Sequence, residues 1–208
     1  MNDLTVQELL LNNLGFTQEN VNKLKIFHDE LLRYNKKFNL ISRSTENDIW
    51  SRHFLDSAQI VKFIHFQDNK SLCDLGSGAG FPGMVLAIFN KNPNFHVKLY
   101  EKSPLKCDFL SKIAKITDTK AEIMTGSYSS YKIDSSYIIA RAFKKLPEMI
   151  RISREIAKKS HKMIILKGKN AQEEINKAFQ STNFKYKLEN SITDKQSKII
   201  ISNALKSE

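Results

Sequence analysis

The hydrophobic positions of this 208-residue chain follow a helical period up to about residue 70. Apolar side chains recur every three or four residues in three stretches, and we expect a helix in each. The first covers residues 3–13 and stops at Gly15, a typical C′ residue. Thr17 caps the second helix, and Ser44 or Thr45 opens the third. Each helix has one apolar face, so the three must pack against another part of the chain.

From residue 71 the period changes, and short apolar runs alternate with helical stretches. The expected strands are residues 72–75, 96–100, 121–124, 137–140, 163–166, 184–188 and 198–202. The expected helices are residues 82–90, 104–116, 146–159 and 171–179. Pro82 and Pro104 stand at the N1 position of the first two, and Ser103 precedes the second as a cap. The alternation predicts an α/β fold with a mostly parallel, doubly wound sheet. Residues 1–66 would be a helical cap of the same globular unit, and residues 67–208 the α/β domain.

Composition excludes several classes of protein. With 41% hydrophobic and 26% charged residues, the chain can bury a sizeable core and is not a disordered tail. Cys73 and Cys107 are far apart, without a zinc-like spacing, so neither a disulfide framework nor a metal site is expected. The chain starts without a basic leader and has no apolar run long enough to cross a bilayer. We therefore expect a soluble, cytoplasmic protein without a membrane partner, and a monomer.

The charge is distributed unevenly along the chain. Residues 1–70 hold 9 basic and 9 acidic side chains, whereas residues 141–208 hold 16 basic and 7 acidic ones. The net charge of +11 thus comes mostly from the last third, which suggests an anionic partner, above all a nucleic acid. The alternative is that a lysine-rich composition merely solvates the surface.

Four of the seven glycines fall within eight residues, in the run Asp74-Leu-Gly76-Ser-Gly78-Ala-Gly80-Phe-Pro-Gly83. A strand feeding a glycine turn and a helix exposes backbone amides to a nucleotide-like ligand, because no Cβ stands in the way. The pattern Gly78-x-Gly80-x-x-Gly83 satisfies the dinucleotide fingerprint. The pattern from Asp74 to Gly80 is instead the one by which many methyltransferases hold S-adenosylmethionine. The predicted strand ends at residue 75, which favours the second register.

Glu101 ends the next predicted strand, 21 residues beyond Gly80. A carboxylate there can accept hydrogen bonds from both hydroxyls of a ribose, in either cofactor. The alternative is a surface glutamate that is ion-paired with Lys102. Glu101 therefore points to an adenosine site and does not name the chemistry.

Five sequence blocks in the same order resemble those of a known family, the bacterial guanine-N7 methyltransferases of small-subunit (16S) ribosomal RNA, also called the glucose-inhibited division protein B family. The blocks are residues 34–40 (YNKKFNL), 52–57 (RHFLDS), 74–83 (DLGSGAGFPG), 141–143 (RAF) and 166–168 (LKG). The chain departs from the family pattern at Leu105, Ser127 and Ala140, where other residues are usual. The resemblance implies a Rossmann-like class I fold and an enzyme that uses S-adenosylmethionine to methylate N7 of a guanine in an RNA loop.

The expected site residues divide by role. Guanine N7 has a free lone pair at neutral pH, so we expect no general base, and the enzyme mainly aligns the reactants. Arg141 would position the substrate from a strand end, where its fork of donors can hold a phosphate or O6, and Lys167 is its counterpart on the next strand. The alternative for Arg141 is a structural salt bridge, and for Lys167 a solvated lysine. The expected cofactor-binding residues are Asp74, Gly76, Ser77, Gly78, Gly80, Phe81, Glu101, Ser127, Tyr128 and Arg141. The expected RNA-binding residues are Arg52, His53, Lys106 and Lys167.

Other interpretations remain open at this point. Arg52 and Asp56 can form an i, i+4 pair, with His53 packed between the two parts of the chain. Phe81, Tyr128 and Phe143 can each stack on an unpaired base or belong to the core. The chain as a whole could instead be an NAD-linked oxidoreductase, or a non-catalytic RNA-binding or ribosome-assembly protein on the same fold.

Overall fold

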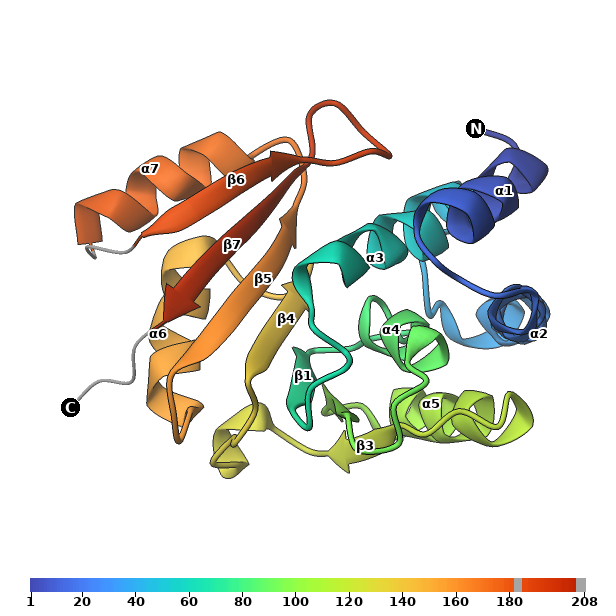
Figure 1. Ribbon diagram of the computed structural model, residues 1–208, viewed down its shortest axis with the longest axis horizontal. Helices are drawn as coiled ribbons and strands as arrows, with labels where there is room; N and C mark the ends of the chain where they lie inside the picture. The colour runs from blue at the N-terminus through green and yellow to red at the C-terminus, as the bar shows by residue number, and fades with distance from the viewer. Residues whose placement is uncertain (182–184, 205–208) are drawn as a thin grey trace.

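The computed structural model describes residues 1–181 and 185–204, and in this part of the chain a single seven-stranded sheet is covered by helices on both faces (Figure 1). The strands are β1 (Ser71–Leu75), β2 (His96–Glu101), β3 (Glu122–Thr125), β4 (Tyr137–Arg141), β5 (His161–Lys167), β6 (Tyr186–Asn190) and β7 (Lys198–Ala204). Their order is β3-β2-β1-β4-β5-β7-β6. The first five are parallel, and β7 is antiparallel to both of its neighbours. The predicted mostly parallel, doubly wound sheet is confirmed.

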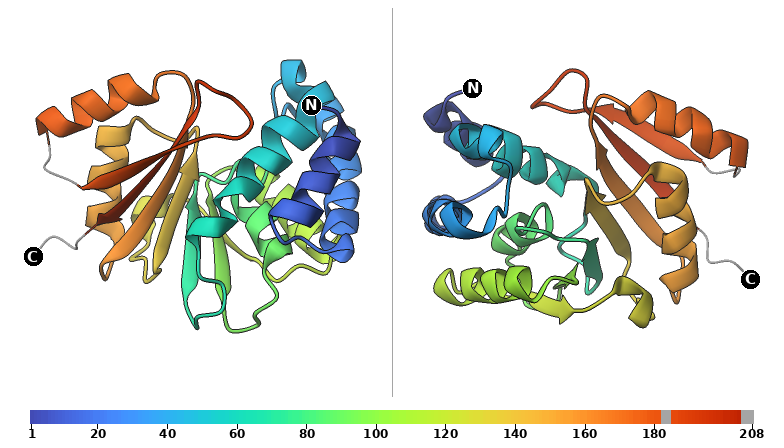
Figure 2. Two further views of the ribbon diagram at one scale, coloured as in Figure 1. Left: turned by 45° about the horizontal axis from the view of Figure 1, so that its top comes forward. Right: turned by 180° about the vertical axis from the view of Figure 1, so that it is seen from behind.

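Two groups of helices cover the two faces of the sheet, as Figure 2 shows from two further directions. On one face lie α1 (Asp3–Asn13), α2 (Gln18–Phe38), α4 (Gly83–Phe89) and α5 (Pro104–Ile116). On the other face lie α6 (Leu146–Ile156) and α7 (Ala171–Ser181). Along β4, Ile139 belongs to the core of the first face, whereas Ile138 and Ala140 belong to that of the second. This alternation is why a strand buried on both faces reads as one continuous apolar run.

The N-terminal helices begin where their caps predict. The Thr17 hydroxyl accepts a hydrogen bond from Asn20 N at 3.2 Å, and the Asn20 side chain accepts one from Thr17 N at 2.9 Å. These reciprocal bonds form a capping box at the start of α2. Gly15 follows the end of α1 and has a φ of +73°, the left-handed conformation that is common just after a helix.

The third predicted N-terminal helix is not one regular helix, which corrects the sequence analysis. It comprises a 3₁₀ helix η1 (Arg43–Asp48), a π turn η2 (Trp50–Leu55), a short α3 (Asp56–Ala58) and a 3₁₀ helix η3 (Gln59–Phe63). Each piece has only three to six residues, which is too few for the apolar spacing to distinguish helices with different numbers of residues per turn. In a π turn the backbone hydrogen bonds span five residues instead of four. Such turns are often found at functional sites.

Smaller differences concern helix ends. Pro82 is the N-cap of α4 rather than its N1 residue, and the Ser103 side chain makes no capping hydrogen bond to α5. Helix α6 ends at Ile156, three residues before the predicted end, because Ile133 N donates to Ile156 O at 2.8 Å in a bridge. The predicted strand over residues 184–188 begins at Tyr186 where the chain is described, and Phe184 lies outside the described residues.

The sheet topology determines where a ligand can bind. The chain moves outward from β1 to β3 and then returns to pair β4 with β1, so β1 and β4 flank a switch point. In open α/β sheets, ligands bind outside the carboxyl ends of the strands at such a point. Gly76 and Arg141, at the ends of β1 and β4, lie at this edge. Among the described residues, no helix has the length and hydropathy of a membrane span.

Candidate functional site

The glycine turn after β1 is held against the next strand by its own backbone. Gly76 N and Ser77 N both donate to Tyr100 O, at 2.9 and 3.1 Å. Gly76 and Gly78 have φ values of +71° and +58°, in the left-handed region that favours glycine. A Cβ on Gly76 would also collide with the ring of Phe143, which lies directly over the turn. The turn therefore needs glycine for both backbone conformation and close packing.

Asp74, a predicted cofactor-binding residue, lies beneath this turn and is fully buried. Its Oδ2 accepts a hydrogen bond from Gly83 N at 2.9 Å, at the start of α4, and a Cβ on Gly83 would come within 2.6 Å of the same oxygen. Its Oδ1 has no hydrogen-bond partner among the described residues. Burial raises the pKa of the Asp74 carboxyl to about 7, although the hydrogen bond from the Gly83 amide, the nearby Ser77 side chain and the charge of Arg141 act to lower it. In this structure Asp74 fastens the helix to the sheet.

Glu101 lies at the end of β2 with its carboxylate over the glycine turn. Its Oε2 accepts from Gly78 N and its Oε1 from Ser103 N, both at 2.9 Å. Its partners are thus backbone amides, not the adjacent Lys102. Each carboxylate oxygen can still accept a second hydrogen bond. The two amides fix the carboxylate beside the glycine turn.

A cavity of about 540 Å³ opens beside the glycine turn and Glu101, and we call it the donor cavity. It is lined by Leu40, Ile41, His53, Gly76, Ser77, Gly78, Ala79, Phe81, Tyr100, Glu101, Lys102, Lys106, Gly126, Ser127, Tyr128, Arg141, Ala142, Phe143 and Lys144. Of the predicted cofactor-binding residues, Asp74 and Gly80 are not in this lining. Gly80 faces the core instead, where a Cβ would lie within 3.1 Å of Phe27 and Leu110. Lys106, predicted to bind RNA, lines the donor cavity.

Sequence reasoning missed the apolar wall of this cavity, Leu40 and Ile41. Both follow the end of α2, where Asn39 has a φ of +47°. The buried Asn35 side chain accepts from Ile41 N at 2.8 Å and donates to Glu46 Oε1 at 2.6 Å. These two bonds fold the chain back at the end of α2, so that the wall faces the glycine turn. The signal was present in the residue 34–40 block, but a buried asparagine is not visible in an apolar pattern.

Arg141, at the end of β4, joins the sheet to the irregular helical segment. One of its terminal nitrogens donates to Arg52 O at 2.8 Å and to Asp56 Oδ2 at 3.1 Å. The other lies 2.7 Å from His53 Nδ1, and the guanidinium stands 5.2 Å above the Phe81 ring. The sequence interpretation of an Arg52–Asp56 pair is therefore wrong, because Asp56 pairs with Arg141 and Arg52 lies 3.7 Å from Asp194. Arg141 therefore makes the structural salt bridge that the sequence analysis gave as its alternative role.

His53 is held neutral by this arrangement. Burial lowers its pKa to about 3, and the charges of Arg141 and Arg52 act in the same direction. Because Arg141 can only donate, His53 Nδ1 must accept, and the ring proton lies on Nε2, 3.0 Å from the Thr45 hydroxyl. The ring also stacks on Phe81, with centroids 4.8 Å apart. The predicted packing of His53 between the two parts of the chain is what the structure has.

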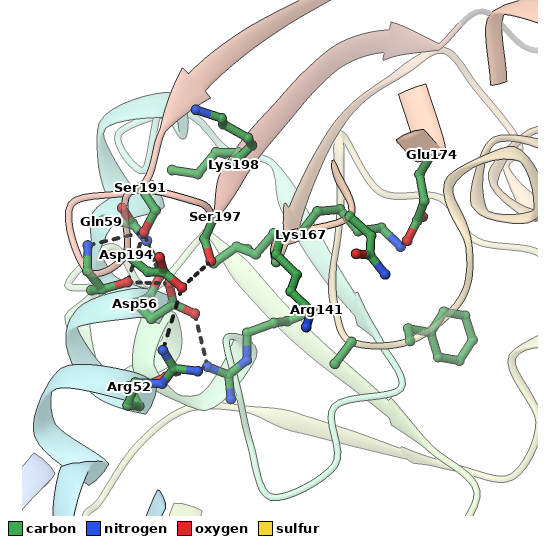
Figure 3. A pocket seen from close by; sticks show the side chains of 18 of the residues that line it. Arg52, Asp56, Gln59, Arg141, Lys167, Glu174, Ser191, Asp194, Ser197 and Lys198 are labelled. Atoms are coloured by element: carbon green, nitrogen blue, oxygen red, sulfur yellow. Dashed lines mark hydrogen bonds and ion pairs between the residues drawn. The ribbon is translucent and has the colours of Figure 1, made fainter. Parts of the chain in front are cut away.

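A second, larger hollow of about 870 Å³ lies on the other side of Arg141, and we call it the groove (Figure 3). Four separate segments line it, at residues 45–59, 141–148, 166–174 and 191–199. In Figure 3, Arg52, Asp56 and Arg141 meet at one end, and Lys167 turns towards Glu174. The groove and the donor cavity share five lining residues, which we call the shared wall: His53, Arg141, Ala142, Phe143 and Lys144.

The loop between β6 and β7 closes one end of the groove. Gln59 Nε2 donates to Ser191 Oγ at 3.0 Å, and Ile192 N donates to Gln59 Oε1 at 2.9 Å. The Thr193 hydroxyl donates to Asp56 Oδ1 at 3.0 Å. Through Asp56, the residue 52–57 block thus connects β4, the helical segment and a loop 137 positions away in the sequence. No pattern within the block predicts the loop contacts.

Lys167 is less available than the sequence analysis expects. Its ammonium lies 2.7 Å from Glu174 Oε2 and also donates to the Lys144 carbonyl, and only 9% of its side chain is exposed. The same Glu174 oxygen accepts from Leu146 N at 2.7 Å, at the start of α6. Lys167 therefore holds α6 and α7 together at the end of β5. Its charge is neutralised within the chain.

The three candidate stacking aromatics differ in their environment. Phe81 is buried between Phe27 and His53 and belongs to the core. Tyr128 and Phe143 are partly exposed and pack edge to face, with centroids 5.3 Å apart. Phe143 lines both the donor cavity and the groove, whereas Tyr128 lines only the donor cavity. Phe143 is therefore the aromatic residue that a base entering from the groove would meet.

Comparison with known proteins agrees with this geometry. A family model described as rRNA small subunit methyltransferase G matches residues 20–202. The ribosomal RNA small subunit methyltransferase G of Orientia tsutsugamushi (strain Ikeda) is 36% identical over 196 residues, which is 94% of this chain and 96% of that protein. That of Rickettsia felis is 38% identical over 192 residues, 91% of this chain and 96% of that protein.

Solved structures with little sequence similarity share the fold. A S-adenosylmethionine-dependent methyltransferase from Aquifex aeolicus superimposes with a TM-score of 0.58 at 10% identity, covering 72% of this chain and 90% of that one. Aeropyrum pernix fibrillarin, solved with bound S-adenosylmethionine, gives a TM-score of 0.56 at 13% identity, covering 73% and 75%.

The fold, with its glycine turn and strand-end carboxylate at the switch point, is that of a Rossmann-like class I methyltransferase. The chain belongs to the rRNA small subunit methyltransferase G family. The predicted family, fold and enzyme class are confirmed: the protein is a S-adenosylmethionine-dependent methyltransferase that acts on ribosomal RNA. The family does not support the alternatives of an NAD-linked oxidoreductase or a non-catalytic RNA-binding protein.

Proposed function

We propose that this protein transfers the methyl group of S-adenosylmethionine to N7 of a guanine in a loop of 16S ribosomal RNA, acting as a monomer on the small subunit in the cytoplasm. One observation carries the proposal: the donor cavity and the groove meet at the shared wall, at the carboxyl end of β4. A methyl donor and a bulky acceptor can therefore reach the same point from two sides.

The residues of the donor cavity fit the donor. The left-handed Gly78 leaves open space beside the turn, and the fixed Glu101 carboxylate can accept from both ribose hydroxyls. Leu40 and Ile41 supply an apolar wall. When bound, the donor supplies an electrophilic sulfonium methyl group. The role of the chain is to hold that group towards the shared wall and to keep bulk water away.

The acceptor needs alignment and no proton transfer before attack. Guanine N7 is unprotonated at neutral pH, so the reaction depends on holding N7 in line with the methyl group at about 3 to 3.5 Å. His53 already accepts a hydrogen bond from Arg141, and Asp56 is engaged by Arg141 and Thr193, so neither is arranged as a general base. We assign the guanine to the exposed face of Phe143, since stacking on an aromatic ring is how unpaired bases are commonly held.

The contacts of Arg141 support a positioning role. Arg52 O, Asp56 and His53 use three of its five N–H donors, so the guanidinium is held in place within the chain and only two donors remain for a phosphate or O6. We propose that Arg141 acts mainly by holding the shared wall in position beside the glycine turn. Residues 1–66 then act as a cap to the domain of residues 67–208, because they supply Leu40, Ile41 and His53 to the donor cavity.

A transfer assay tests the function directly. Purified protein, S-adenosylmethionine with a labelled methyl group and small subunits lacking the modification are combined, and the RNA is digested to nucleosides. We expect label in N7-methylguanosine. Label in another nucleoside would replace guanine N7 as the acceptor, and label in ribosomal protein without label in RNA would contradict the proposal.

A further inference from the structure

The charges that line the groove compensate each other only in part. Seven basic and four acidic side chains face it. Each acidic group is paired with a basic group of the same lining. The pairs are Asp56 with Arg141 at 3.1 Å, Glu148 with Lys144 at 2.9 Å, Glu174 with Lys167 at 2.7 Å and Asp194 with Arg52 at 3.7 Å. These four pairs cancel in charge, and a net charge of +3 remains.

Three lysines carry that net charge: Lys145, Lys169 and Lys198. Neither Lys145 nor Lys169 has an ion pair with any described residue, and both are exposed. Lys198 donates to the side-chain oxygen of Asn190 at 2.6 Å, a neutral partner that leaves its charge uncompensated. They come from the start of α6, the turn after β5 and the start of β7, so only the fold brings them to one hollow.

We infer that the groove binds a single-stranded segment of the RNA substrate, with Lys145, Lys169 and Lys198 contacting its phosphates. Uncompensated lysines along a hollow attract a polyanion, because binding releases counterions from the phosphates. The groove joins the donor cavity at the shared wall, so a strand in it can present one base to Phe143. An unpaired strand is required, since a base within a helix cannot reach across that wall. The inference rests on the proposed function. It adds the place where the RNA binds and the lysines that contact its phosphates.

The inference separates the basic residues into two groups with different roles. Arg52, Arg141, Lys144 and Lys167 hold the groove in shape through their acidic partners. Lys145, Lys169 and Lys198 have no acidic partner among the described residues of the groove, so their charges can bind phosphate. The sequence analysis named Arg52 and Lys167 as RNA-binding, and their ion pairs place them in the first group.

The test compares two triple variants of equal charge. The first is Lys145→Ala/Lys169→Ala/Lys198→Ala in the groove. The second is Lys25→Ala/Lys91→Ala/Lys120→Ala, whose lysines are exposed and line neither the groove nor the donor cavity. Binding of a short, fluorescein-labelled single-stranded RNA is followed by anisotropy over a range of salt concentrations. Binding of S-adenosylhomocysteine by calorimetry verifies that each variant is folded.

We expect the groove variant to bind the RNA more weakly, on the order of 100-fold at 0.1 M salt, with a salt dependence reduced by about two in log–log slope, since each phosphate contact on a single strand contributes about 0.7. The control variant should keep both the affinity and the slope within about threefold. Equal losses in the two variants would mean that only net charge matters, and would overturn the inference. Unchanged RNA binding in the groove variant, or no RNA binding by the natural protein, would overturn it as well.

Failure of the inference and failure of the proposed function give different results. If the chemistry is wrong, the natural protein forms no N7-methylguanosine, while the two triple variants still differ in RNA binding. If the groove is wrong, methylation by the natural protein persists and the two triple variants bind RNA alike.

Discussion

The donor cavity and the groove lie on either side of the shared wall, yet they are built in opposite ways. The part of the donor cavity next to β1 and β2 is made largely of backbone: a glycine turn of adjacent residues and a carboxylate fixed by two amides. The groove is made of side chains from four distant segments, tied by ion pairs and hydrogen bonds. The first can be recognised from a short motif, because neighbouring residues determine it. The second exists only once the chain is folded.

Gly76→Ala should have the largest effect, on the donor cavity and, through the Phe143 ring, on the shared wall. The residue has a φ of +71°, and its Cβ would collide with the Phe143 ring. Left-handed strain and displacement of the ring together cost about 3 kcal/mol, which is more than 100-fold in affinity for S-adenosylhomocysteine by calorimetry. Gly168→Ala is the matched control, since open space surrounds its Cβ and its φ is not positive. Equal loss in both variants would contradict this explanation.

Asp56→Ala should loosen the groove while the glycine turn stays intact. The change leaves Arg141 and Thr193 without their acceptor in a partly buried place. We expect the free energy of unfolding, measured in urea, to fall by about 2 kcal/mol. Asp48→Ala, at an exposed position in the same helical segment, should change it by less than about 0.5 kcal/mol. If the two variants are equally stable, Asp56 does not hold the junction.

Phe143→Ala tests the wall that both regions share. Loss of the stacking surface should weaken RNA binding and raise KM for RNA about tenfold, since stacking on one base is worth about 1 to 3 kcal/mol. Phe143→Tyr retains the ring and should behave like the natural protein. A fluorescent guanine analogue at the target position of an RNA should be quenched by the natural protein and by Phe143→Tyr. Quenching by Phe143→Ala would remove Phe143 from this role.

The smallest effect concerns pH and the neutral His53. Its pKa is about 3 in the folded protein and about 6.5 when unfolded, so the unfolded chain binds more protons between these values. The contribution of His53 to stability must therefore fall as pH drops through this window, by about 1 kcal/mol at pH 5.5, whereas the raised pKa of Asp74 acts in the opposite direction. In urea unfolding, the difference in stability between pH 7 and pH 5.5 should shift by about 1 kcal/mol in His53→Asn relative to the natural protein, whereas the exposed His65→Asn should not change it. An unchanged slope in His53→Asn would assign the pH dependence to other groups.

The contrast also explains how much of the molecule could be predicted. Periodicity located the described strands and most helices within a few residues, because the sheet is buried on both faces and the helices on one. It could not distinguish the π turn at Trp50–Leu55, since a segment of 6 residues is too short to define a period. The positions of Gly78 in a turn after β1 and of Glu101 at the end of β2 were predicted, because each follows from the end of an apolar strand, and their contact with a cofactor stays a prediction.

Side-chain partners were predicted less well than positions. Asp74 was assigned to the cofactor by its place in the glycine motif, but its Oδ2 accepts a hydrogen bond from Gly83 N. Lys167 and Arg141 were found at the strand ends, as expected, but with acidic partners from α7 and from the helical segment. Which charge meets which depends on the packing of elements far apart in sequence. A pattern within one segment contains no information about that packing.

Because Asp74 is buried, folding of the chain is accompanied by proton uptake at this carboxyl. With a pKa of about 7 when folded and about 4 when unfolded, this carboxyl is close to half protonated in the native protein at pH 7 and fully ionised in the unfolded chain. Folding at neutral pH therefore takes up roughly half a proton at this one group. The buffer must supply it, so the calorimetric heat of unfolding contains a contribution from buffer ionisation. Comparison of phosphate with Tris buffer would measure how much of that heat belongs to the protein.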